Sequence, residues 1–118
     1  MRRMTAQEEA VWFALRVGAA NARPLREIAL DAGVSRRMAE RAIESLRTEL
    51  HEPICASTEE PAGYFEAATP EDVQDYLERF NHRLATMEAT RTGLLEALRD
   101  MVAAREEVSR ARRLRAVA

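Results

Sequence analysis

Apolar residues in the C-terminal part of the chain recur at alternating intervals of four and three residues. This 3.5-residue period places them along one seam of a helix that pairs with another helix in a coiled coil. A helix over residues 70–114 would be roughly 65 Å long, far longer than a small domain needs for support. We therefore predict a dimerisation helix with a seam made of Val73, Leu77, Phe80, Leu84, Met87, Leu94, Leu98, Met101 and Val108.

Four residues interrupt this seam or weaken the helix. Arg91, Arg105 and Arg112 fall at seam positions. Gly93 lies inside the helix, where glycine costs about 1 kcal/mol relative to alanine. These residues fix the register of the helix pair, or they bend or fray the helix. Two arrangements follow: a homodimer through one continuous helix, and a monomer whose helix breaks at Gly93 and folds back on itself.

The rest of the chain is short and poor in large apolar side chains. Its 118 residues allow one small domain with an appendage. Alanine supplies 22 residues of the 47% hydrophobic fraction, so the globular part has a small core. With 32% charged and 5% aromatic residues, the composition favours a mainly α protein. No apolar run approaches the length of a membrane span, and no apolar signal-peptide core follows the N-terminus. We expect a cytoplasmic protein with no membrane partner.

Charge is unevenly distributed along the chain, although the net charge is only −2. Residues 1–51 hold nine arginines and seven acids, and residues 52–107 hold five arginines and thirteen acids. Residues 108–118 hold four arginines and no acid. Such separation suggests that different segments face different partners. The two ends suit a polyanion, whereas the middle does not.

Three short helices are predicted before the long one. Thr5 and Glu8 form a capping-box pattern that starts the first helix, whose apolar face extends to Gly18-Ala19. Pro24 suits the start of a second helix, and Gly33 suits its end. Ser35 is a favoured N-cap for a third helix over residues 36–50. Two helices around a turn that contains glycine make a helix-turn-helix candidate.

The third helix is amphipathic and is followed by a predicted hairpin. Its inward face consists of Ala39, Ala42, Ile43 and Leu46. Residues 54–57 and 64–67 are short strand-like segments on either side of a polar loop, which predicts a two-stranded β ribbon. The aromatic residues Trp12, Phe13, Tyr64 and Phe65 are expected to pack in the core or at the base of the ribbon.

The segment LREIALDAGVSRRMAERAIESL, residues 25–46, resembles the helix-turn-helix of bacterial and phage winged-helix DNA-binding proteins. In that family the residue matching Ala29 lets the helices approach, and the residue matching Gly33 makes the turn. Residues 53–57 with Gly63 and Tyr64 are similar to the wing of the biotin-repressor type. The resemblance covers about residues 5–69. It implies a mainly α fold with a small two-stranded β wing, in which residues 1–69 form the winged helix-turn-helix domain and residues 70–118 form the dimerisation helix with a basic tail.

The resemblance also implies which residues contact DNA, because the N-terminal part of the recognition helix meets base edges and phosphates in the major groove. The candidate DNA-binding residues are Ser35, Arg36, Arg37, Glu40, Arg41, Arg47 and Arg26. Arginine can pair bidentately with guanine. In a second interpretation, Arg37 and Arg41 form ordinary surface pairs with Glu40 and Glu44.

We therefore expect a sequence-specific protein that binds double-stranded DNA as a homodimer, a transcriptional regulator or a phage-type accessory factor. Its half-sites should lie one turn apart, about 34 Å, or a multiple of that distance. The predicted wing favours another class of protein. Glu59 and Glu60 would repel phosphates, and no arginine lies between residues 48 and 78. That class is an assembly module that docks a protein partner through the acidic wing on a coiled-coil stalk, for example in phage replication or packaging. A ligand-sensing regulator ranks last.

Catalysis finds no support in the sequence. It contains no glycine-rich phosphate loop, no nucleophile elbow, no HExxH motif and no compact set of acid and base residues. Cys55, His51 and His82 show no metal-ligand spacing. We expect a protein that is not an enzyme, with no catalytic residues, no metal and no cofactor.

Overall fold

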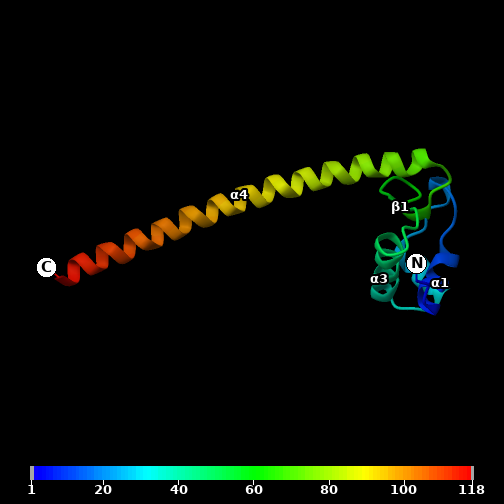
Figure 1. Cartoon of the computed structure of the whole chain (residues 1–118), viewed down its shortest axis with the longest axis horizontal. Helices are drawn as coiled ribbons and strands as arrows, with labels where there is room; N and C mark the ends of the chain where they lie inside the picture. Colours follow the sequence, from blue (N-terminus) through cyan, green and yellow to red (C-terminus); the bar gives the residue numbers. More distant parts are fainter. Residues whose placement is uncertain (1, 118) are drawn as a thin grey trace. The chain divides into compact units, whose positions relative to one another are not determined.

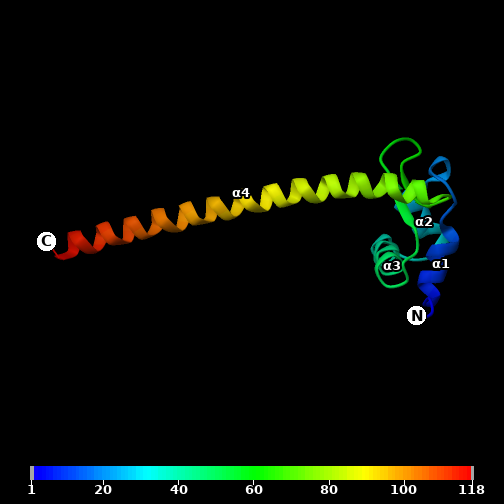
Figure 2. The same ribbon diagram turned by 45° about the horizontal axis from the view of Figure 1, so that its top comes forward.

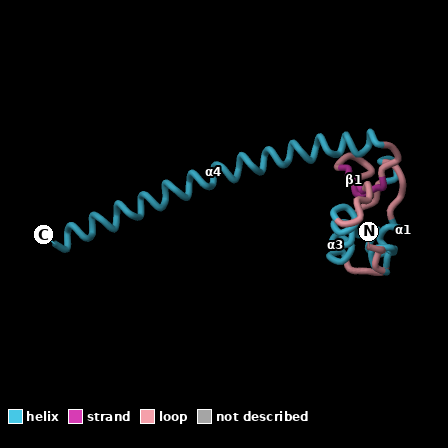
Figure 3. Tube along the Cα trace, in the orientation of Figure 1, coloured by secondary structure: helices cyan, strands magenta, loops and turns pink. Residues whose placement is uncertain are grey.

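The computed structural model describes residues 2–117 and consists mainly of helix (Figure 1). The elements in chain order are α1 (Ala6–Ala14), the short 3-10 helix η1 (Ala19–Asn21), α2 (Leu25–Ala32), α3 (Arg36–Thr48), β1 (Ile54–Ser57), β2 (Gly63–Glu66) and α4 (Pro70–Val117). The two strands form a small sheet (Figure 3). They pair antiparallel, with Cys55 opposite Phe65. The predicted fold class, mainly α with a small β wing and a long C-terminal helix, is confirmed.

The starts of α1 and α4 follow the capping signals in the sequence. At the start of α1, the Thr5 hydroxyl accepts a hydrogen bond from the Glu8 N–H at 3.1 Å. The Glu8 carboxylate accepts one from the Thr5 N–H at 2.8 Å, which completes the capping box. At the start of α4, the Thr69 hydroxyl accepts from the Asp72 N–H at 3.3 Å. The helix then continues through Gly93 without a break.

The first helix is shorter than the sequence predicted, and its extension to Gly18-Ala19 is wrong. Gly18 has a φ of 91°, outside the helical region, and its N–H donates to the Glu66 carbonyl at 2.9 Å. A little further on, Arg23 and Tyr64 exchange two backbone hydrogen bonds of 3.0 and 2.8 Å. Pairing with β2 therefore satisfies backbone groups that a longer helix would have satisfied internally.

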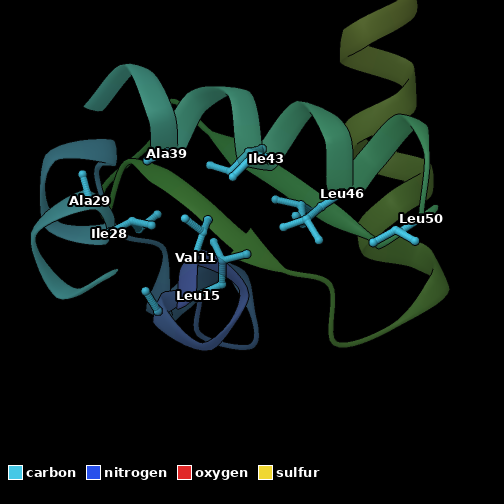
Figure 4. Packing of buried hydrophobic residues seen from close by; sticks show 11 residues of the cluster. Val11, Leu15, Ile28, Ala29, Ala39, Ile43, Leu46 and Leu50 are labelled. Carbon is cyan, nitrogen blue, oxygen red and sulfur yellow. The ribbon is translucent and has the colours of Figure 1, made fainter. Parts of the chain in front are cut away.

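Helices α1, α2 and α3 enclose the main core (Figures 2 and 4). Val11 of α1, Ile28 of α2 and Leu46 of α3 are fully buried in it. The predicted inward face of α3 is buried as expected. Phe13 was expected to join the core, but 76% of its surface is exposed. It stands two positions after Val11, a rotation of about 200° around a helix, so it cannot share the face that Val11 buries.

A second, smaller cluster connects the sheet to the first turns of α4. Cys55 and Phe65 are buried in it, and Val73 and Tyr76 pack against them. Because of this packing, the N-terminal compact unit extends to Glu78, beyond the boundary at residue 69 that the sequence suggested. The second unit begins at Arg79 and consists of the rest of α4.

Candidate nucleic-acid interface

The turn between α2 and α3 sets where α3 begins. Gly33 has φ 70° and ψ 31°, a left-handed conformation that glycine adopts without steric cost. The Val34 N–H donates to the Ala29 carbonyl at 3.1 Å, and the Ser35 hydroxyl accepts from the Met38 N–H at the same distance. Ala29 is buried, so no large side chain holds the two helices apart. The turn is therefore fixed by backbone and cap hydrogen bonds at the position where α3 starts.

The N-terminal half of α3 exposes the face opposite to its buried one. Exposed there are Ser35, Arg36, Arg37, Glu40 and Arg41, five of the predicted DNA-binding residues. Among residues 2–117, no carboxylate lies within 4.0 Å of the guanidinium nitrogens of Arg36, Arg37 or Arg41. The surface pairs with Glu40 and Glu44 that we considered are not formed. Three guanidinium groups thus lie exposed on one short stretch of helix with their charge uncompensated by a local ion pair.

Arg26 is exposed too, but its surroundings differ. It lies in the first turn of α2 and lines a groove between that turn and the loop that joins β1 to β2. Glu27 and Glu60 line the same groove. Arg26 therefore belongs to a surface of mixed charge, and the arginines of α3 make the stronger candidate for an anion-binding face.

Arg47 is held within the fold. Its Nε donates to the Ile54 carbonyl at 2.8 Å and its Nη2 donates to the Tyr76 hydroxyl at 3.3 Å. Its guanidinium carbon also lies 5.4 Å from the ring centroid of Tyr64 and 5.3 Å from that of Tyr76, within the range of cation–π attraction. Arg47 thus connects α3 to the sheet and to the start of α4.

The wing is acidic and exposed at its tip. Glu59 and Glu60 lie on the surface of the loop between β1 and β2. The Ser57 hydroxyl accepts a hydrogen bond from the Glu59 N–H at 3.2 Å, which orders the start of this loop. No arginine lies between residues 48 and 78. The wing therefore offers carboxylates and no cation to a partner.

Two structural roles of arginine were not anticipated from the sequence. The side chain of Arg2 donates to Glu8 through both terminal nitrogens at 2.7 Å, and it also forms an ion pair with Glu49. The hydrogen bonds from Arg2, joined by the one from the Thr5 N–H, lower the pKa of the buried Glu8 to about 2. The spacing of Arg2 to Glu8 carries no helical signal, because Arg2 precedes the helix.

The second role is that of Arg23. Its Nη1 donates to the Ala14 carbonyl at 2.9 Å and to Asp31 at 2.6 Å, and its Nε lies 3.6 Å from Glu27. Here the sequence did contain a signal, since acids four and eight residues after an arginine fall on one face of the following helix. Arg23 thereby fastens the end of α1 to α2.

The predicted dimerisation residues of α4 lie on the surface, with one exception. From Leu77 to Val108 the eight apolar seam residues are between 41% and 70% exposed. Leu95 and Val102, which the seam did not include, add to the exposed apolar surface. The exception is Val73, which packs against the cluster around Cys55 and Phe65 of its own chain. The surface open to a partner helix therefore begins at Leu77.

Neither a metal-ligand cluster nor a membrane-spanning helix occurs in the described part of the chain. In residues 2–117, no three His, Cys, Asp or Glu side chains gather as metal ligands would. None of the helices over the same residues combines the length and apolar character needed to cross a membrane. No protein-family model, no curated protein and no solved structure matches the chain. Its function must therefore be argued from the chemistry of its own surface.

Proposed function

We propose that this chain is a sequence-specific protein that binds double-stranded DNA as a homodimer, with the N-terminal half of α3 as its recognition element. It would serve as a transcriptional regulator or a phage-type accessory factor. The observation that carries the proposal is the exposed, unpaired state of Arg36, Arg37 and Arg41 at the start of a helix that follows a tight turn. Such a helix start reaches base edges in the major groove of DNA.

The chemistry of these side chains suits that role. A guanidinium group can donate two parallel hydrogen bonds to the O6 and N7 atoms of guanine, or bind phosphate oxygens. Ser35 is exposed beside the arginines, and its hydroxyl can donate a hydrogen bond to a phosphate oxygen while its oxygen caps α3. Glu40, on the same exposed face, can accept a hydrogen bond from the N4 amino group of cytosine. The face thus contains both positioning and base-reading groups.

The test is selection of bound duplexes from a random-sequence DNA library. It is run on the native chain and on a variant with Arg36→Ala, Arg37→Ala and Arg41→Ala. A matched control replaces the exposed residues Arg3, Arg16 and Arg99 with alanine, which removes the same charge from positions outside α3 and off the α4 seam. We expect a repeated or palindromic motif to be enriched by the native chain and by the control, and not by the α3 variant.

A second candidate function rests on the wing. Glu59 and Glu60 are exposed, and the wing carries no compensating cation, so a docking surface for a basic protein partner is the other class to consider. Electrostatic DNA binding is strongest at low salt. If no duplex is enriched even there, the DNA-binding proposal fails and the assembly module becomes the better one.

A further inference from the structure

The charges along α4 are sorted by position. Its first turns contain Glu71, Asp72, Asp75 and Glu78 and no basic residue, whereas its last turns contain Arg110, Arg112, Arg113 and Arg115 and no acid. In a parallel pair of such helices, acids would lie beside acids and arginines beside arginines. In an antiparallel pair, each acidic end would lie beside a basic end. The helix dipoles also favour the antiparallel pair, because opposite partial charges then meet at both ends.

The seam supports the same orientation. In a parallel pair in register, each seam residue faces its own copy, so Arg91 would face Arg91 and Arg105 would face Arg105. An antiparallel pair that places Leu77 level with Val108 of a second copy avoids both layers. Arg105 then lies level with Phe80, and Arg91 lies level with Leu94. Every seam arginine in this span thus meets an apolar residue along which its methylene stem can pack.

The remaining layers of the same register are apolar on both sides. Leu84 lies level with Met101, and Met87 lies level with Leu98. Each of these four side chains is about half exposed or more in the single chain. Pairing with a second α4 helix would bury this apolar surface away from water. Gly93 lies off the seam, next to the centre of the pair.

We propose that α4 binds α4 of a second copy in the antiparallel orientation, with Leu77 of each chain level with Val108 of the other. This inference rests on the homodimer in the proposed function and adds its orientation. Each N-terminal domain is joined to the start of its helix, so the two domains attach to opposite ends of a paired segment about 48 Å long.

The orientation is tested by disulfide cross-linking of two variants that each add one cysteine to Cys55, Leu84→Cys and Met101→Cys, without any DNA. The two proteins are oxidised separately and after being mixed, unfolded in urea and refolded together. In the antiparallel pair, cysteines at 84 and 101 are level, whereas two cysteines at 84 are about 26 Å apart along the axis, too far for a disulfide. We expect cross-linked dimer from the mixture and from neither variant alone. The unmodified chain serves as the control for Cys55, which is buried.

The possible outcomes separate the orientation of the pair, the formation of a dimer and the binding of DNA. Cross-linking of Leu84→Cys by itself would show a parallel pair and overturn the orientation, while leaving DNA binding by a dimer intact. A monomer in sedimentation velocity at micromolar concentration would overturn the dimer and with it the orientation, and the duplex selection would still decide DNA binding independently. Should either variant lose the helical circular-dichroism signal of the native chain, Met87→Cys with Leu98→Cys makes the same test one layer nearer the centre.

Discussion

Arg2 and Glu8 form a bidentate ion pair in which Nη1 and Nη2 of the arginine each donate to one carboxylate oxygen at 2.7 Å. Glu8 is buried, and it also caps α1 by accepting from the Thr5 N–H. The pair therefore ties the residues before α1 to the first turn of that helix. The hydrogen bonds from Arg2 lower the pKa of Glu8 to about 2.

The Arg2–Glu8 pair predicts a pH-dependent stability. The pKa of Glu8 is lower in the folded chain than the ordinary value of 4.5, so the pair stabilises the fold fully above that value and progressively less as the pH falls towards 2. Glu8→Gln should lower the free energy of unfolding at pH 7. Urea unfolding of both proteins between pH 7 and pH 2.5 measures the difference. We expect it to shrink below pH 4.5, and a difference that is constant over this range would contradict the assignment.

Two glycines provide a second prediction, because a Cβ would clash with neighbouring backbone at Gly63 and would meet open space at Gly93. A Cβ at Gly63 would overlap the backbone carbonyl of Arg23, and its φ of 131° is unfavourable for any other residue. Gly63→Ala should therefore destabilise the N-terminal unit by about 2–3 kcal/mol. Gly93 lies in α4 with nothing near its Cβ position, so Gly93→Ala should stabilise α4 by about 1 kcal/mol. Thermal unfolding followed at 222 nm compares both variants with the native chain, and a destabilising Gly93→Ala would argue against a continuous α4.

Local features of this fold follow from the sequence more directly than long-range ones. Caps and turns were predicted because their hydrogen bonds join residues three or four apart, as with Ser35 and Met38. The end of α1 was not, because it depends on backbone pairing between Gly18 and Glu66, which lie far apart in the chain. Exposure of the α3 arginines followed from helical period alone. The internal role of Arg47 did not, because it depends on Tyr76 reaching α3 from the start of α4.

The wing supplies a third prediction. If DNA binds along the exposed face of α3 with the wing beside it, the carboxylates of Glu59 and Glu60 repel its phosphates. Glu59→Gln with Glu60→Gln should then raise the affinity for duplex DNA, by a few-fold at low salt and less as salt screens the repulsion. Fluorescence anisotropy at several salt concentrations measures the change. An unchanged affinity would place the wing away from the duplex. Glu96→Gln with Glu106→Gln, both exposed on α4, provides the control for the same loss of charge elsewhere on the surface.

Arg37 and Arg47 should respond to substitution in opposite ways. Arg37 is exposed with no ion-pair partner in the described residues, so Arg37→Ala should leave the free energy of unfolding nearly unchanged. It should instead reduce the slope of log affinity against log salt by about 1 if the guanidinium binds a phosphate. Arg47→Met should do the reverse. It removes the hydrogen bonds to Ile54 and Tyr76, which costs about 1–3 kcal/mol of stability.

The Arg47→Met protein that remains folded should bind DNA with the native salt dependence, because Arg47 lies outside the proposed interface. Urea unfolding and anisotropy titrations on the same two proteins make the comparison. If Arg47→Met is fully folded and its log affinity still depends less steeply on log salt than that of the native chain, Arg47 belongs to the DNA-binding face. If Arg37→Ala instead lowers the free energy of unfolding, the exposed face of α3 contributes to the stability of the fold. That result would weaken the assignment of this face as a partner-binding surface.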